Sequence, residues 1–174
     1  MQSESKVPVE LETERLRLRQ WQLDDWPHFR RYAGDPEATR YTYGGALDEG
    51  QSWRIMASMA GHWHLRGYGP YALEDKQTGS LLGTVGFWFP VDWPEPEIKW
   101  ALDRSHWGRG YASEAARCVL KTGQRYLPET PWISFIHQQN HASIRLAEAL
   151  GAKWERTLPF RGDQFHVYRH QQQP

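Results

Sequence analysis

The clearest chemical signal in this sequence is the segment Gly108, Arg109 and Gly110, which leads directly into a helical pattern. A glycine loop before a helix leaves backbone N–H groups without intrahelical partners, at the positive end of the helix dipole. Such loops bind anions, and phosphate is a common ligand. Because Gly-x-Gly before a helix is also compatible with a plain tight turn, the loop alone leaves both interpretations open.

The elements around this loop follow from hydrophobic periodicity and from helix caps and turn residues. We predict strands over residues 13–19, 71–74, 81–89, 97–103, 132–137, 153–158 and 164–169, and helices over about 24–33, 48–64, 111–124 and 140–150. This order places a strand–loop–helix–strand unit inside a single α+β (mixed α/β) domain. We expect the domain to span residues 11–170, between a flexible N-terminus at 1–10 and a frayed tail at 171–174.

Composition excludes several classes of function. The 174 residues carry 21 basic and 21 acidic side chains, so no general attraction to nucleic acid or to an anionic membrane is expected. No apolar run approaches a membrane span, and the N-terminus does not resemble a signal peptide. Cys118 is the only cysteine, which agrees with a reducing compartment. We therefore expect a cytoplasmic protein.

A metal site is not expected. His62 and His64 form a His-x-His pair, but residues two apart on a helix point in different directions. No cysteine or acidic cluster near this pair completes a ligand set.

The segment from Trp107 to Ala112 resembles the acetyl-CoA motif of the GNAT superfamily of N-acetyltransferases, which reads Gln or Arg, two residues, Gly, one residue, then Gly or Ala. Trp107 departs from the first position of that motif. Together with TERLRLR, EIKWALDRSHWGRGYASEAA and NHASIRLAEALGA, this departure is similar to the branch of ribosomal-protein N-terminal alanine and serine acetyltransferases. The resemblance covers residues 11–168.

The resemblance implies a fold and a donor. The fold would be a mostly antiparallel twisted sheet of about seven strands, flanked by helices and splayed between its two central strands. Acetyl-CoA would be the co-substrate, with its pyrophosphate on the amides of the loop and Arg109 adding a charged contact. Its pantetheine arm would pair with the strand that precedes the loop, and Asn140, a helix cap on any interpretation, would lie near it. The implied contact residues are Trp100, Ala101, Leu102, Trp107, Gly108, Arg109, Gly110, Tyr111, Ala112, Asn140 and Ser143.

The resemblance also implies catalytic roles. Glu97 matches the glutamate that related enzymes use as a general base through water, and Glu95 is the substitute if the strand register differs. The usual tyrosine for the leaving thiolate falls on Ala147, so Ser143, or a water, would take that role. The alternatives are structural: Glu97 as a strand carboxylate paired with Lys99, and Ser143 as a helix-start serine that bonds the backbone.

The acceptor is less defined. A primary amine is expected, either a peptide or protein N-terminus or a small molecule, in a site bordered by Tyr41, Tyr43, Trp63 and Arg161. The high aromatic content makes a homodimer plausible. The other function considered is a non-catalytic GNAT-fold module that binds acyl-CoA or senses a ligand. A dinucleotide fold is disfavoured because Ser113 stands at the third glycine position of its fingerprint.

Overall fold

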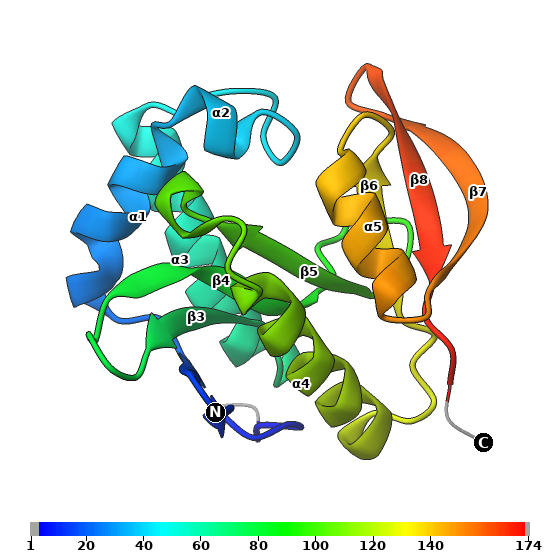
Figure 1. Cartoon of the computed structure of the whole chain (residues 1–174), viewed down its shortest axis with the longest axis horizontal. Coiled ribbons are helices and arrows are strands. Elements are labelled where there is room, and N and C mark those ends of the chain that lie inside the picture. Colours follow the sequence, from blue (N-terminus) through cyan, green and yellow to red (C-terminus); the bar gives the residue numbers. More distant parts are fainter. Residues whose placement is uncertain (1–3, 173–174) are drawn as a thin grey trace.

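The order of the elements agrees with the prediction over residues 4–172, which this computed structural model describes (Figure 1). The strands are β1 (Leu11–Glu12), β2 (Leu16–Arg19), β3 (Pro70–Asp75), β4 (Leu81–Trp88), β5 (Glu97–Leu102), β6 (Ile133–His137), β7 (Lys153–Phe160) and β8 (Asp163–Arg169). The helices are α1 (Trp26–Ala33), α2 (Pro36–Thr39), α3 (Glu49–Arg66), α4 (Tyr111–Tyr126) and α5 (His141–Ala149), with 3₁₀ turns η1 (Leu23–Asp25) and η2 (Arg104–His106). Mixed α/β architecture is confirmed.

The strands form one sheet in the order β1-β2-β3-β4-β5-β6-β8-β7, eight strands within the described residues rather than about seven. All neighbours run antiparallel except β5 and β6, which are parallel and pair only at Glu97 with Ile133. Beyond this pair the two central strands separate, so the predicted splay is confirmed. On its other side β5 pairs with β4 over its whole length, which fixes its backbone while its β6 edge stays open.

Helices cover both faces of the sheet. In Figure 1, α4 crosses in front of the central strands and α3 lies behind them. The predicted apolar stripe of α4 is confirmed, since Ala115, Ala116 and Val119 are fully buried in the main hydrophobic core. On the other face, α1 and α3 bury a second cluster around Phe29 and Met59. The helix that starts at the glycine loop is therefore anchored by packing along its length.

Strand β1 was not predicted, and β7 and β8 extend one or two residues further toward each other than predicted. Two other segments differ in kind. The strand expected over 13–19 begins only at Leu16, because the Thr13 hydroxyl and the Arg15 amide bind the Glu114 carboxylate instead of a neighbouring strand. The connection before Tyr41 contains helix α2, whose N-cap Asp35 accepts hydrogen bonds from two backbone amides. Both differences arise from hydrogen bonds of polar side chains that hydrophobic periodicity does not report.

The chain ends are partly packed. Within the segment expected to be flexible, Val7 is buried, Lys6 N donates to Gly67 O, and Tyr71 donates to Pro8 O, so residues 6–8 are held against the domain. At the other end, Gln171 O accepts a hydrogen bond from Gln124. Residues 1–3 and 173–174 of the predicted flexible ends lie outside the described residues. None of the helices in 4–172 is long and apolar enough to cross a membrane.

Candidate active site

The glycine loop leaves the N-terminus of α4 open. Gly108 and Gly110 both adopt left-handed backbone conformations, with φ of 74° and 77°. Gly110 is the N-cap of α4, and no side chain caps the helix. Because left-handed φ values are costly for residues with a Cβ, the two glycines make this path of the backbone possible. The uncapped amides of the first turn are free to bind an anion.

A residue that the sequence analysis missed holds this loop in place. Arg15 donates from Nη1 to the carbonyl of Arg109 at 2.9 Å and forms an ion pair with Glu114 at 2.7 Å. Its guanidinium also lies 4.4 Å from the centre of the Tyr111 ring. Arg15 therefore connects the loop and the first turn of α4 to the start of β2. The sequence gives no local signal for this contact, since Arg15 and Arg109 are 94 positions apart.

Trp107 connects the loop to β5. Its indole Nε1 donates to the carbonyl of Leu102 at 3.0 Å, although the ring is 49% exposed. This bond ties the start of the loop to the end of the strand, which is a structural role for the residue that departs from the family motif. Leu102 was expected among the residues that contact the pantetheine arm, and its carbonyl already accepts this hydrogen bond from Trp107.

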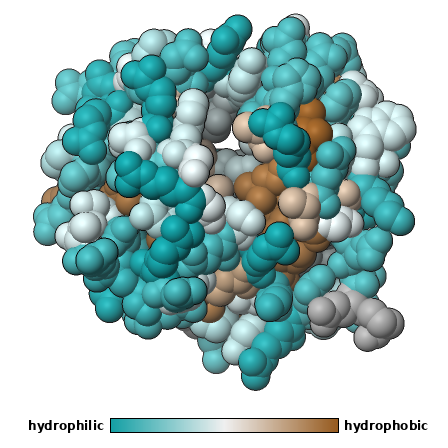
Figure 2. Space-filling model, in the orientation of Figure 1, coloured by the Kyte–Doolittle hydropathy of each residue, from teal (hydrophilic) through white to brown (hydrophobic). Residues whose placement is uncertain are grey.

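A cleft of about 640 Å³ runs from the glycine loop along the open edge of β5 to the start of α5. Figure 2 shows a hollow near the centre of this face of the molecule. Of the predicted cofactor contacts, only Arg109 does not line the cleft; its side chain is exposed. Those that line it are Trp100, Ala101, Leu102, Trp107, Gly108, Gly110, Tyr111, Ala112, Asn140 and Ser143. We call this space the donor cleft.

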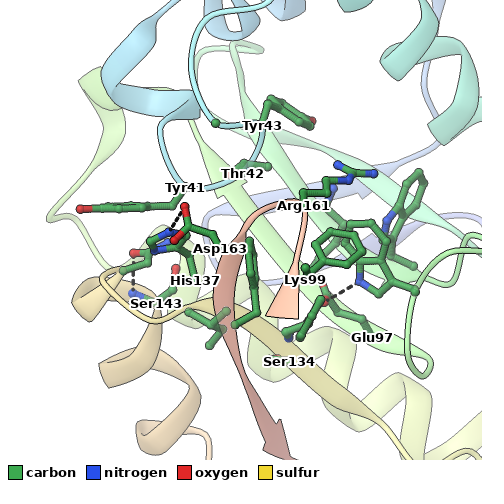
Figure 3. A pocket seen from close by; sticks show the side chains of 18 of the residues that line it. Tyr41, Thr42, Tyr43, Glu97, Lys99, Ser134, His137, Ser143, Arg161 and Asp163 are labelled. Atoms are coloured by element: carbon green, nitrogen blue, oxygen red, sulfur yellow. Dashed lines mark hydrogen bonds and ion pairs between the residues drawn. The ribbon is translucent and has the colours of Figure 1, made fainter. Parts of the chain in front are cut away.

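A second cavity, of about 250 Å³, lies on the other side of the splay and is lined by Glu97 (Figure 3). It meets the donor cleft at residues common to both linings: Arg40, Tyr41, Thr42, Trp100, Asn140 and Ser143. A group bound in one space thus comes close to a group bound in the other. We call this second space the acceptor cavity.

The Glu97 side chain is buried, with 5% of the residue exposed, and only one of its two carboxylate oxygens accepts hydrogen bonds from the protein. Oε2 accepts hydrogen bonds from Trp93 Nε1 at 2.9 Å and from the Phe135 amide at 3.0 Å, which leaves the acceptor capacity of Oε1 to another group. Burial raises the pKa of Glu97 to about 7, against the opposing effects of Trp93, the Lys99 charge and the Phe135 amide. Burial also lowers the pKa of Lys99. A carboxyl group with a pKa near neutrality is suited to accepting and releasing a proton.

Glu95 has a different environment. It lies outside the lining of the acceptor cavity and forms ion pairs with Arg156 at 2.8 Å and with Arg169 at 2.9 Å. Its carboxylate thus joins the loop before β5 to strands β7 and β8. The structure gives Glu95 a bridging position and Glu97 a position beside the cavity.

Ser143 lies where the two spaces meet, in the first turn of α5. Its amide donates to the side chain of Asn140, so the predicted N-cap is confirmed. Its hydroxyl oxygen accepts a hydrogen bond from Trp100 Nε1 at 3.1 Å. Because an indole can only donate, the serine O–H remains available as a donor to a further group. Ala147, at the usual tyrosine position, is fully buried.

The predicted acceptor residues divide into two groups. Tyr41, Tyr43 and Arg161 line the acceptor cavity, and Figure 3 labels them among its lining residues. Trp63 does not, and the prediction for it was wrong: it is 4% exposed, packs edge-on against Tyr71 and donates to the carbonyl of Pro70. Helical periodicity identified Trp63 as buried but not the neighbours that bury it.

The His-x-His pair does not form a metal site within the described residues. His62 is buried, with Nδ1 2.7 Å from the carbonyl of Tyr68 and Nε2 accepting from the amide of Phe89 at 2.9 Å. In the part of the chain that the structure describes, no three His, Cys, Asp or Glu side chains are grouped to hold a metal ion.

Comparison with known proteins defines the class. Residues 15–153 match the acetyltransferase (GNAT) domain family, and the chain belongs to this family. It is 31% identical over 150 residues to a Bacillus licheniformis protein named uncharacterized N-acetyltransferase p20, covering 85% of this chain and 84% of that protein. The sequence is therefore that of an acetyl-CoA dependent acetyltransferase.

Solved structures give the same class. The crystal structure of an acetyltransferase from Agrobacterium tumefaciens is 32% identical, covers 95% of each chain and has a TM-score of 0.84. A structure described as RimL, a ribosomal L7/L12 α-N-protein acetyltransferase in complex with coenzyme A, has a TM-score of 0.72 over 94% of this chain and 96% of that one. At 17% identity, this second likeness shows the shared fold.

Proposed function

We propose that this protein transfers an acetyl group from acetyl-CoA to a primary amine by direct attack on the thioester. The observation that carries the proposal is the meeting of the two spaces at Ser143. A donor cleft with an uncapped helix N-terminus at one end opens at its other end onto a cavity that contains Glu97. This arrangement suits a reaction in which donor and acceptor bind together and react without a covalent enzyme intermediate.

The donor is held by backbone groups in this proposal. The first-turn amides of α4, beginning at Tyr111, bind the pyrophosphate, and the open edge of β5 pairs with the pantetheine arm. Asp103 N donates to Leu82 O, so the alternation along the β4–β5 pair turns the backbone groups of Ala101 toward β4 and those of Trp100 toward the open edge, where Trp100 lines the cleft. Arg15 and Trp107 position the loop through their hydrogen bonds to the carbonyls of Arg109 and Leu102.

Glu97 acts as the general base. An amine must be neutral to attack, and a carboxylate with a pKa near 7 removes the proton, through a water where the distance requires one. The nitrogen forms a bond to the thioester carbon, the carbon–sulfur bond breaks, and the thiolate leaves. After the attack the nitrogen still carries one proton too many, and this proton passes through water and the Ser143 hydroxyl to the thiolate, which becomes the CoA thiol. The proton that Glu97 took from the ammonium returns to solvent.

The test is an acceptor screen with the purified protein and acetyl-CoA, read as free thiol released over time. The panel holds peptides with N-terminal Ala or Ser, as for the ribosomal-type enzymes, and small amines. Amine-dependent thiol release with formation of the N-acetyl product supports the proposal. Acetyl-CoA binding by calorimetry, without turnover of any amine, would identify a non-catalytic acyl-CoA-binding module instead.

A further inference from the structure

Resting on the proposed acetyl transfer, we infer that the acceptor is a compact aromatic monoamine, rather than a polyamine or a peptide N-terminus. The walls of the acceptor cavity carry the inference through three independent properties: their rings, their charges and the space they enclose. Figure 3 shows the residues that form these walls around Glu97.

The walls are a continuous series of aromatic side chains in contact with one another. Trp93 lies edge-on to Trp88, to Phe135 and to Phe160, with centroid distances of 6.2, 6.1 and 5.1 Å. The series continues from Phe135 to Phe165 at 4.9 Å and, through His137, to Tyr41. These side chains come from β4, β6, β7, β8 and two loops, and all of them line the cavity. A ring in the cavity gains edge-to-face contacts beyond the burial of its area.

The cations of the wall already occupy ring faces. Lys99 Nζ lies 4.8 Å from the centre of the Trp88 ring, and the Arg161 guanidinium lies 4.8 Å from the Phe160 ring. Arg40 lies over Tyr41 at 5.3 Å. A second ammonium on the acceptor would need the same faces, beside these positive charges. The wall therefore disfavours a polycation.

The carboxylates of the wall are also engaged. Asp92 forms an ion pair with Arg161 at 3.1 Å, and Asp163 lies 3.1 Å from His137 Nε2. The third carboxyl group is Glu97, which the proposed reaction uses for the attacking amine. Asp92 and Asp163 each have one carboxylate oxygen engaged, so a second ammonium would compete with Arg161 and with His137 for these groups. The lining therefore favours a single amine.

The size of the cavity limits the acceptor. Its 250 Å³ equals the volume of roughly eight waters, at about 30 Å³ each, which is room for one ring and a short amine-bearing arm. A peptide would place its first residue here and the remaining residues outside. The cavity thus has room for the whole of a small free amine but only for the first residue of a peptide.

The primary test compares four probes by kcat/KM with the wild-type protein: phenethylamine, cyclohexylethylamine, spermidine and an alanine-initiated peptide. We expect kcat/KM for phenethylamine to be about 100-fold or more higher than for spermidine or for the peptide, because spermidine would bring a charged group, and the peptide backbone groups, that find no partner in the cavity. Cyclohexylethylamine has a similar shape but no π-system, and we expect kcat/KM for phenethylamine to be about 5-fold higher than for this amine.

Two variants locate the effect. Phe160→Leu should raise KM for phenethylamine about 5-fold and leave KM for acetyl-CoA unchanged. The control is Trp154→Leu, which removes an exposed ring from the same strand outside the cavity.

Arg161→Gln frees both Asp92 and the Phe160 face, and should raise the turnover of spermidine relative to that of phenethylamine about 10-fold. The control for this variant is Arg156→Gln, since Arg156 and its ion-pair partners Glu95 and Glu155 lie outside the lining of the acceptor cavity and the ratio of the two turnovers should stay unchanged.

The outcomes separate this inference from the proposed function. If spermidine or the peptide is the better acceptor, or if the ring and its saturated counterpart react equally, the aromatic monoamine is wrong while acetyl transfer stands. If no amine reacts although acetyl-CoA binds, acetyl transfer itself is wrong. Selective turnover of phenethylamine that is weakened by Phe160→Leu and not by Trp154→Leu supports both.

Discussion

The donor cleft and the acceptor cavity are built in opposite ways. The donor cleft presents backbone: an uncapped helix N-terminus after Gly110 and the open edge of β5. The acceptor cavity presents side chains, mainly rings from strands and loops distant in the sequence. Backbone groups are the same in every protein, so the donor cleft suits a donor that a whole family shares. Side chains can change while the fold stays the same, so the acceptor cavity is where the acceptors of different family members can differ.

The two spaces share few residues, which separates donor binding from acceptor choice. Ser143 and Trp100 lie at the junction, linked by a hydrogen bond. Substitutions in the loop should therefore affect acetyl-CoA affinity, substitutions in the aromatic wall should affect acceptor KM, and those at the junction should affect kcat. The following experiments test this division, from the largest expected effect to the smallest.

Gly110→Val should weaken acetyl-CoA binding by more than about 100-fold. A β-branched side chain is strained at φ 77° and redirects the first-turn amides of α4. Calorimetric titration with acetyl-CoA measures the effect. Gly79→Val is the control, because Gly79 has a similar φ of 71° in the β3–β4 turn, with open space around it. Equal losses in both variants would trace the effect to backbone strain alone.

Glu97→Gln should lower kcat/KM by about 10- to 1000-fold while acetyl-CoA affinity stays within about 2-fold. The amide keeps the shape of the side chain but cannot accept the proton. Steady-state kinetics with the best acceptor measures the loss. Glu95→Gln serves as the comparison, since it weakens the ion pairs with Arg156 and Arg169 and should retain most activity. A larger loss for Glu95→Gln would reverse the assignment of the base.

The pH dependence should report the same group. Burial raises the pKa of Glu97 to about 7, and the base must be ionised, so below that value the fall of kcat/KM with decreasing pH should steepen by a further factor of about ten per pH unit. The acceptor amine titrates as well, at higher pH. In Glu97→Gln the inflection near neutrality should disappear and the amine inflection remain. An unchanged profile in the variant would show that another group controls the rate.

Ser143→Ala should have the smallest effect, a decrease in kcat of about 10-fold with little change in either KM. The loss removes the hydrogen bond to the departing sulfur and leaves the Trp100 indole without its acceptor. Single-turnover kinetics with acetyl-CoA would isolate the step. Ser143→Thr should retain much of the activity because it keeps the hydroxyl. Full activity of Ser143→Ala would instead assign the protonation to water.

The local features of the donor cleft were predictable from the sequence. Gly108 and Gly110 stand directly before a periodic helix, and Asn140 stands at a cap position, so short-range rules identify both helix starts. The capping box of Asp48 and Gln51 at the start of α3 follows the same short-range rule. Arg15 was missed because its partners lie on α4 and its loop, far along the chain.

The acceptor side was predictable only in part. Tyr41, Tyr43 and Arg161 were placed near the acceptor by analogy with the family, and they line the cavity. Trp63 was misplaced, since a helical stripe shows which face is buried but not against what. The rings of Trp93, Phe135, Phe160 and Phe165 carry no spacing signal, because four separate segments supply them.

The sequence by itself determined that a strand enters a glycine loop and a helix, and this local order predicts where a phosphate-bearing donor binds. Only the tertiary structure decided which carboxyl group lies beside the cavity, and that three cations cover its ring faces. The reason is the range of the interactions involved. Backbone conformation and capping depend on neighbours within a few residues, whereas desolvation of Glu97 and contact between aromatic rings depend on segments that only folding brings together.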